Sequence, residues 1–315
     1  KDPRQNPGPG GAMRFLRRSV LAMAGVLLVM AVYAETPWKT VRVAATSLPA
    51  IIVPETRRPA PGGMPHALIA PGARPGDISA AWYAGRTKRC AHSILGDAIE
   101  ASILRAATRD GRYLKLTLPE IEVFEDRYPR LADLDGDGTT EIITIRSSVS
   151  HGASVTVYGV QDNKLVFRAT TGLIGRANRW LNIAGIAPFR GGKGQEIAYV
   201  QTPHIGGTLF FYAYEGGKLV KVAESKGFSN HQIGSTEMRL SATVDIDGDG
   251  VPELALPAAD RRTLRISGFQ NKQLTERGSA SLPSGIDKAI GVVGRGSSAR
   301  FVVGLENGLV FEINR

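Results

Sequence analysis

Short runs of alternating hydrophobic and polar residues fill the chain from Gly76 onward. Three such runs follow one another at a spacing of about ten residues, namely EIITIRSS from Glu141, ASVTVYGV from Ala153 and KLVFRATT from Lys164. A period of two, broken by Gly, Asn and Asp, is typical of antiparallel strands joined by tight turns. No long stretch carries the period of an amphipathic helix, so the pattern predicts an all-β fold.

The strand pattern repeats along the chain. RLADLDGDGTTEIITI, residues 130–145, is followed by IAGIAPFRGGKGQEIAYV at 183–200 and by SATVDIDGDGVPELAL at 241–256. The position of Asp133 recurs at Pro188 and Asp245, and weaker copies lie before and after, so that five units are visible. A period near fifty residues with four short strands per unit predicts a β-propeller of about five four-stranded blades.

The ring of blades needs one more strand. The last unit ends after three strands at Arg315, while an unassigned strand, DISAAWYAG at 77–85, precedes the first unit. An open blade edge would present unpaired backbone groups to other molecules. We therefore expect residues 77–85 to complete the last blade as an N-terminal closing strand.

The first 76 residues divide by composition into three segments. Residues 1–12 resemble an upstream extension, residues 13–34 a signal peptide, and residues 35–76 a Pro/Gly/Ala-rich linker that leads to a propeller at 77–315. Three arginines precede an apolar run at 20–34, which is shorter than the roughly 20 residues of a membrane-spanning helix. The segment predicts export to the periplasm or outside the cell, without a stable membrane span after cleavage. A retained anchor is the alternative.

Charge and cysteine content narrow the function classes. The 315 residues carry a net charge of +10, of which residues 1–34 contribute four, and no stretch interleaves Lys or Arg with aromatic residues. We therefore expect no nucleic-acid partner. Cys90 is the only cysteine, which excludes an internal disulfide and metal sites built on paired thiolates. We interpret it as a small apolar strand residue. The sequence does not determine the oligomeric state.

Two loops concentrate carboxylates. Four acids lie within nine residues at 133–141, and the same spacing, Asp-x-Asp-x-Asp-Gly-x-x-Glu, recurs at 245–253. Carboxylates at this density repel one another unless a cation neutralises them, and a hard cation that takes six or seven oxygens, calcium, suits the spacing. An EF-hand would need its last acid at position twelve, which is Thr144, and helices on both sides. A plain Asp-Gly turn without an ion is the alternative.

Acidic loops between strands resemble the FG-GAP or VCBS repeat of integrin-type calcium-binding propellers over residues 89–315. In that family the loop joins the first and second strands of a blade. The resemblance implies these ligands, with the carbonyl group at the fourth position of each set: Asp133, Asp135, Asp137, Thr139 and Glu141; Asp245, Asp247, Asp249, Val251 and Glu253. The middle copy departs from the pattern, with Pro188, Arg190 and Gly192 in place of acids and only Glu196 retained. We expect it to bind nothing, and we expect calcium to be structural in the other two.

Loops on the opposite face collect residues suited to a ligand. Strands alternate in direction, so the loops between the second and third strands and the loops between blades lie away from the calcium loops. They carry these candidates for ligand binding: His151, Arg176, Asn178, Arg179, Trp180, His204, Asn230, His231, Arg261 and Arg262. Guanidinium groups recognise anions, and an aromatic ring can stack on a sugar. Backbone hydrogen bonding by the histidines and a core position for Trp180 are the alternatives, and a transition-metal site would depend on geometry.

Three function classes remain. No nucleophile elbow, phosphate loop or His-Glu-x-x-His motif is present. We therefore expect a noncatalytic exported module that binds a protein or a glycan, or else a scaffold in an envelope assembly. The alternative is a hydrolase or lyase that cleaves an envelope or extracellular polymer with His151, His204 or His231 as acid or base. A separate acidic and basic stretch, VFEDRYPR at 123–130, is interpreted as an ion-pair network between blades.

Overall fold

The computed structural model describes residues 37–47, 57–62 and 64–315. The segments predicted as upstream extension and signal peptide, 1–12 and 13–34, lie outside the described residues. Within the described part of the chain, no helix is long and apolar enough to span a bilayer.

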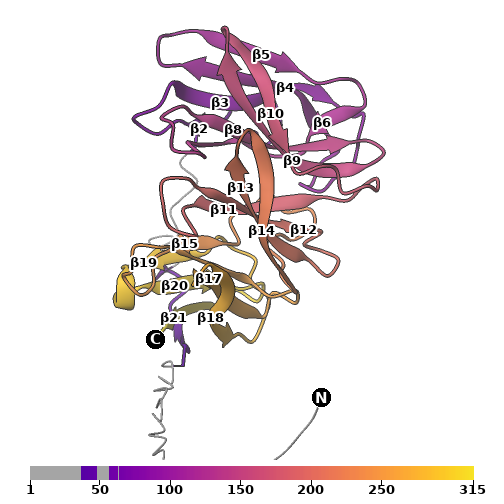
Figure 1. The fold of residues 1–315 in the computed structure, drawn as a ribbon. Helices are drawn as coiled ribbons and strands as arrows, with labels where there is room; N and C mark the ends of the chain where they lie inside the picture. The colour runs from indigo at the N-terminus through magenta and orange to yellow at the C-terminus, as the bar shows by residue number, and fades with distance from the viewer. Residues whose placement is uncertain (1–36, 48–56, 63) are drawn as a thin grey trace, which may run out of the picture. The chain divides into compact units, whose positions relative to one another are not determined.

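The fold is all-β and consists of several antiparallel sheets (Figure 1). A nine-stranded sheet contains two groups of strands, and β6 (Glu122–Phe124) joins them because it pairs with both β4 and β8. The first group comprises β2 (Ala70–Pro71), β3 (Ile78–Thr87), β4 (Glu100–Thr108) and β5 (Tyr113–Thr117). The second comprises β7 (Arg130–Ala132), β8 (Glu141–Ser148), β9 (Gly152–Gln161) and β10 (Lys164–Thr170). The three strands predicted from the alternating runs are confirmed as β8, β9 and β10.

Three further sheets have four strands each. The third group is β11 (Leu181–Ala187), β12 (Glu196–Gln201), β13 (Thr208–Glu215) and β14 (Lys218–Lys226). The fourth is β15 (Ala242–Val244), β16 (Glu253–Pro257), β17 (Thr263–Gln270) and β18 (Gln273–Ser281). The last is β19 (Gly291–Val293), β20 (Arg300–Gly304) and β21 (Val310–Asn314), together with β1 (Lys39–Val43) and a short 3₁₀ turn η1 (Gly296–Ser298) between β19 and β20.

The strand that completes the last sheet is β1, and the expectation that residues 77–85 do so is wrong. Lys39 to Val43 pair with Asn314 to Val310 in antiparallel register. Residues 78–87 form β3, which pairs with β4 of the first group. β1 therefore lies inside the segment predicted as a linker, whose Pro/Gly/Ala content concealed a five-residue strand with alternating Val41 and Val43.

The core lies between consecutive groups of strands. Tyr83 and Leu104 of the first group pack with Ile142 of the second, and Ala184 and Phe211 of the third pack with Leu254 and Leu256 of the fourth. The second strands are buried on both faces, since β8 and β16 lie between neighbouring sheets. The outer strand β14 is polar and rich in lysine, which protects an edge from pairing with other chains. The ring of five blades remains a prediction, because no core cluster of the described residues joins the last group to the first.

Candidate functional site

The two acidic loops join the first and second strands of their groups, at β7–β8 and β15–β16. Each loop is folded by its first aspartate, whose side chain accepts backbone N–H groups across the turn. Oδ1 of Asp133 accepts from Gly136 at 2.7 Å, and Oδ2 accepts from Gly138 at 2.9 Å. Asp245 repeats this pattern with Gly248 at 2.6 Å and Gly250 at 3.0 Å. The glycines have positive φ values, from 77° to 90°, which suit a turn that no branched residue adopts easily.

Each loop gathers three carboxylates around one point that can hold a metal ion. The groups are Asp133, Asp135 and Glu141, and Asp245, Asp247 and Glu253, and in each the oxygen atoms lie within 4.8 Å of one another. The third aspartate of each loop lies outside this group. Asp137 and Asp249 accept the backbone N–H of Thr139 and Val251, each at 2.7 Å. The structure thus brings together three of the four side chains in each predicted ligand set.

The final glutamate of each loop is buried among other acids. Glu141 is 6% exposed and Glu253 is 2% exposed, and each accepts one backbone N–H, from Leu134 at 2.8 Å and from Ile246 at 3.0 Å. Burial, followed by the charge of the neighbouring aspartates, raises the pKa of each carboxyl to about 7. A carboxylate in such surroundings is stabilised by a nearby cation.

The middle loop, between β11 and β12, contains that cation as a side chain. Glu196 begins β12 as Glu141 begins β8, and it is 4% exposed. Nε of Arg190 donates to Oε1 of Glu196 at 2.8 Å, and the backbone N–H of Arg190 donates to Oε2 at 3.2 Å. Arg190 stands where the other loops have Asp135 and Asp247. The guanidinium therefore neutralises the buried glutamate in a loop that has no aspartates at these positions.

The two acidic loops differ in one neighbour. Arg277 on β18 is almost buried, and its Nη2 pairs with Oδ2 of Asp247 at 2.6 Å. The residue in the same register of β10, Arg168, instead donates to Oε1 of Gln161 and to the carbonyl of Val160, both at 3.2 Å. Asp247 of the second loop therefore has a salt bridge to Arg277, whereas Arg168 forms no salt bridge with an acid of the first loop in the described part of the chain.

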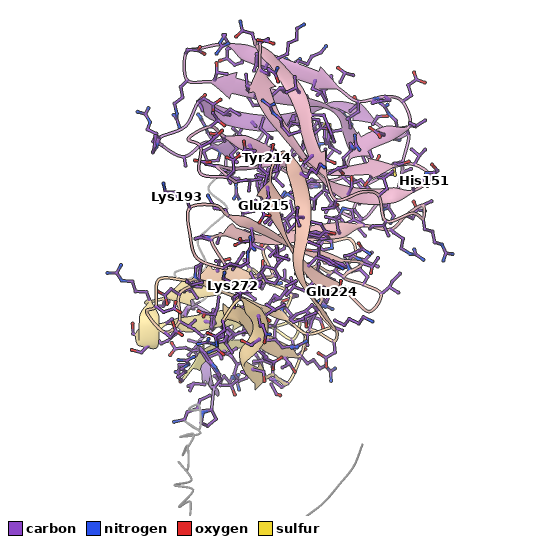
Figure 2. All side chains as sticks on the ribbon, viewed as in Figure 1. His151, Lys193, Tyr214, Glu215, Glu224 and Lys272 are labelled. Carbon is purple, nitrogen blue, oxygen red and sulfur yellow. The ribbon has the colours of Figure 1, made fainter. Side chains whose placement is uncertain are left out.

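Three predicted residues of the opposite loops form a compact cluster. His204 lies in the β12–β13 loop, His231 lies between β14 and β15, and Trp180 immediately precedes β11. The Trp180 and His204 rings are parallel within 3° with centroids 6.1 Å apart, and His231 is tilted against Trp180 at 4.7 Å. The β12 strand separates this cluster from the loop of Arg190 by about 20 Å, at 3.3 Å per residue. Figure 2 shows His151 of a β8–β9 loop and Lys193 of the β11–β12 loop on opposite sides of the ribbon.

Hydrogen bonds fix the tautomers of the two histidines. Nε2 of His231 lies 2.9 Å from the carbonyl oxygen of Ser235, which can only accept, so neutral His231 carries its proton there. Its Nδ1 then accepts a hydrogen bond from Nε2 of His204 at 3.0 Å. The lone pair of neutral His204 is left on Nδ1. Burial lowers the pKa of both histidines to about 4. The charge of Arg261 adds to this effect in both, and the charge of His204 adds to it in His231.

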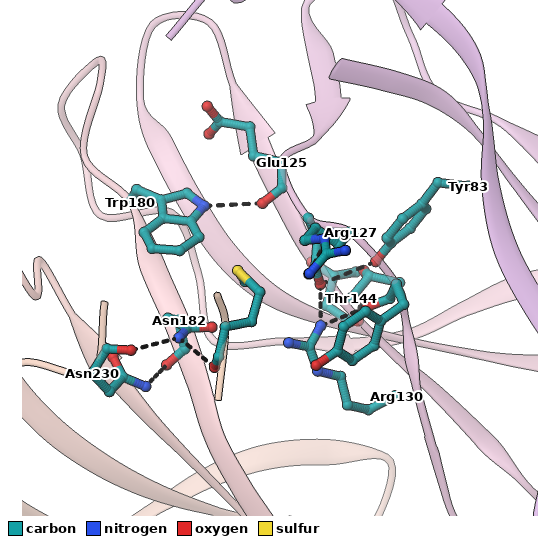
Figure 3. A network of polar contacts seen from close by, with 12 residues as sticks. Tyr83, Glu125, Arg127, Arg130, Thr144, Trp180, Asn182 and Asn230 are labelled. Carbon is teal, nitrogen blue, oxygen red and sulfur yellow. Dashed lines mark hydrogen bonds and ion pairs between the residues drawn. The ribbon is translucent and has the colours of Figure 1, made fainter. Parts of the chain in front are cut away.

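Sequence reasoning missed two residues that complete the cluster, His92 and Glu125. His92 lies in the β3–β4 loop, and its Nδ1 is 2.9 Å from Oε1 of Glu125, which is 3% exposed. The hydrogen bond to this carboxylate raises the pKa of His92. The Glu125 carbonyl accepts the indole N–H of Trp180 at 3.0 Å, while its side chain points away from the indole (Figure 3). The sequence contained one signal for His92. This histidine lies in a weak copy of the repeat, in the loop that corresponds to the loops of His151 and His204 in other copies.

The stretch at 123–130 combines a structural network with a cluster residue. Arg130 forms an ion pair with the fully buried side chain of Asp126 (Figure 3). Nη1 of Arg127 donates to the Thr236 carbonyl at 2.6 Å. The ion pair is local to this stretch, and the link to the segment before β15 is a hydrogen bond to a backbone carbonyl, so an ion-pair network between blades stays a prediction. Glu125 takes part in the histidine cluster instead.

The other predicted ligand residues have different surroundings. Asn230 is fully buried and exchanges hydrogen bonds with Asn182 (Figure 3). His231 and Trp180 are also buried, at 0% and 2% exposure, so these three residues position the cluster and do not offer a surface for stacking. Arg261 pairs with Glu306 at 2.5 Å. Arg179 is half-buried, and its charge partly offsets the rise in the pKa of His92 that the hydrogen bond to Glu125 causes. The remaining candidates are exposed: His151, Arg176, Asn178 and Arg262.

Cys90 lies beside the cluster and is partly buried. It is in a bend, not in a strand as expected, and its Sγ is 3.9 Å from Oε1 of Glu125. Burial and the nearby carboxylates raise the pKa of the thiol to about 12. Cys90, Glu100 and Glu125 place three donor atoms within 4.8 Å of one another, whereas the histidines do not form such a group among the described residues.

A cavity of about 670 Å³ lies along β7, β11 and the segment before β15, and Asp133 of the first acidic loop is among its lining residues. Its arginines are engaged by protein groups. Arg57 lies over the Tyr128 ring at 3.9 Å, Arg130 pairs with Asp126, and Nε of Arg239 pairs with Oε1 of Glu237 at 2.8 Å. The cavity offers space, but its cationic groups already have partners.

Comparisons with known proteins extend the description of the fold. No protein-family model and no curated protein matches the chain. The rhamnogalacturonan lyase YesW matches with a TM-score of 0.50 and 15% identity over 88% of this chain and 53% of that one. The exotype rhamnogalacturonan lyase YesX matches with a TM-score of 0.44 and 15% identity over 75% and 52% of the two chains. This chain spans about half the length of both, and at this identity the likeness to YesW concerns the fold alone.

Proposed function

We propose that this chain is an exported, calcium-stabilised β-propeller of the FG-GAP/VCBS type, with about five blades, that acts as a noncatalytic binding module for a protein or a glycan. The observation that carries the proposal is the comparison of three equivalent loops. Glu141 and Glu253 are buried beside aspartates, and their counterpart Glu196 is buried beside Arg190. A positive charge belongs at this position of the fold, and two loops lack a side chain that fully supplies it.

The donor set favours calcium over other cations. The gathered atoms are carboxylate oxygens, which hard cations prefer, and no thiolate or imidazole lies in either group. Bound calcium would hold the first and second strands of a group together. In the first acidic loop, Asp133 directly follows β7 and Glu141 begins β8. The calcium is structural in this proposal, since the acids come from one tight loop and leave no second group to act on a substrate.

The test measures calcium content and thermal stability together. Binding to the folded state alone should stabilise by about 2.7 kcal/mol per site at a hundredfold excess of calcium over Kd. We expect the native chain to bind two calcium ions, and the variants Asp133→Asn and Asp245→Asn to bind one ion per chain. The control variant Asp162→Asn, which changes an exposed acid in a turn, should still bind two ions. A melting temperature that ignores both calcium and chelator, with no bound calcium, would refute the proposal.

A polymer-cleaving enzyme is the second candidate, and the His204–His231 hydrogen bond favours it. A histidine whose neutral form presents Nδ1 can serve as a general base. YesW is a rhamnogalacturonan lyase, so rhamnogalacturonan is the first polymer to test as a substrate. His204→Ala should abolish turnover if the chain is an enzyme, and should only weaken association if it is a binding module.

A further inference from the structure

The histidine cluster presents two imidazoles with opposite hydrogen-bonding roles. His92 is held at Nδ1 by a buried carboxylate, which favours the protonated ring and turns Nε2–H away from Glu125. His204 is held at Nε2 by His231, which leaves the lone pair of Nδ1 as an acceptor. One histidine is thus arranged to donate a charged hydrogen bond, and the other to accept a neutral one.

Glu125 and Trp180 connect the two histidines, His92 and His204, through a chain of contacts. Glu125 bonds His92 through its side chain and Trp180 through its carbonyl, and Trp180 is parallel to His204. The β3–β4 loop is fixed against the β14–β15 segment by the Gly234 N–H, which donates to the Ile94 carbonyl at 3.0 Å. Burial is the main cause of the lowered pKa of His204, and the charges of Arg261 and His92 add to it.

A guanidinium stands beside this pair. Arg179 is half-buried next to Trp180, and its Nη1 donates to the Asn178 carbonyl at 3.3 Å. No carboxylate in the described part of the chain forms a salt bridge with it, in contrast to Arg261, which pairs with Glu306. Arg179 therefore retains donors for an external anion, and its planar group suits a carboxylate.

We propose that His92, Arg179 and His204 bind an acidic sugar, with the sugar carboxylate at His92 and Arg179 and a sugar hydroxyl donating to Nδ1 of His204. This inference rests on the proposed binding function of this face and names its ligand class. A uronic acid carries a carboxylate and several hydroxyl groups on one ring, which matches two cationic donors beside one neutral acceptor. The buried residues Glu125, His231 and Trp180 act as positioning residues that hold the three contact residues.

The experiment uses galacturonate and galactose, which differ only in the carboxylate, and inorganic phosphate as a simple anion. The full chain is prepared with isotope-labelled histidine and saturated with calcium, and the ring signals are followed by NMR during each titration. We expect galacturonate to shift the signals of His92 and His204 and to leave His151 unchanged. Galactose and phosphate should bind at least about tenfold more weakly, because galactose lacks the carboxylate and phosphate lacks the sugar hydroxyl groups.

Matched variants separate the site from its surroundings. His92→Gln and Arg179→Ala should each weaken galacturonate binding about tenfold or more, while His66→Gln and Arg295→Ala, which change exposed residues outside the candidate ligand loops, should not. The proposal is overturned if galacturonate does not bind, if galactose or phosphate binds as tightly, or if the control variants weaken binding equally. Calcium content and melting temperature, measured on the same samples, report on the calcium proposal independently.

Discussion

Asp135→Arg is expected to replace the ion of the first loop by a side chain. Asp135 occupies the position of Arg190, so the new guanidinium should reach Glu141 as Arg190 reaches Glu196 at 2.8 Å. The substitution also removes one of the three gathered carboxylates. The variant should therefore bind one calcium ion instead of two.

The size of the effect follows from the exposure of the existing pair. The Glu196 side chain is 5% exposed and the Arg190 side chain is 31% exposed. The burial of this ion pair is therefore intermediate between that of a surface pair and that of a buried pair. Surface pairs contribute about 0–1 kcal/mol, and loss of one partner of a buried pair costs about 3–5 kcal/mol. We expect Asp135→Arg in chelator to be about 1–2 kcal/mol more stable than the native chain in chelator, a shift of roughly 2–8 °C in Tm.

The assay is thermal unfolding in calcium and in chelator, combined with elemental analysis of bound calcium. Glu120→Arg is the control, because it makes the same charge change at an exposed turn residue and should alter stability by less than about 0.5 kcal/mol. The reasoning fails if Asp135→Arg still binds two ions, or if it is less stable than the native chain when both are in chelator.

Two other outcomes are expected. Deletion of residues 37–45 removes β1 and leaves β21 as an open edge, so the protein should melt at a lower temperature and aggregate, as light scattering would detect; an unchanged monomer would show that the β1–β21 pairing is dispensable. The pKa of His231 falls from 6.5 in the unfolded chain to about 4 in the folded chain. As the pH drops from 7 to 5, the unfolded chain therefore takes up a proton that the folded chain does not, and the free energy of unfolding should fall by on the order of 2 kcal/mol. Urea unfolding at both pH values measures this loss, which His231→Asn should reduce and His151→Gln should leave intact.

The sequence determined the local features of this protein. The alternation at 141–171 predicted β8, β9 and β10, because a half-buried or buried strand imposes its period directly on the chain. The repeated Asp-x-Asp-x-Asp-Gly spacing predicted two equivalent turns with gathered carboxylates, since all members of each set lie within nine residues. The loss of acids in the middle copy was also visible in the sequence.

Only the tertiary structure decided the features that depend on long-range contacts. β1 pairs with β21 across more than two hundred and sixty residues, and nothing in the linker composition indicated that pairing. His92 is paired with Glu125, and Glu196 is paired with the guanidinium of Arg190. From the sequence, Arg190 was visible only as a position at which the expected acid is missing. Burial separated Trp180, Asn230 and His231 from the exposed candidates. Spacing along the chain encodes a turn, whereas the solvent exposure and hydrogen-bond partner of a side chain depend on which distant segments pack against it.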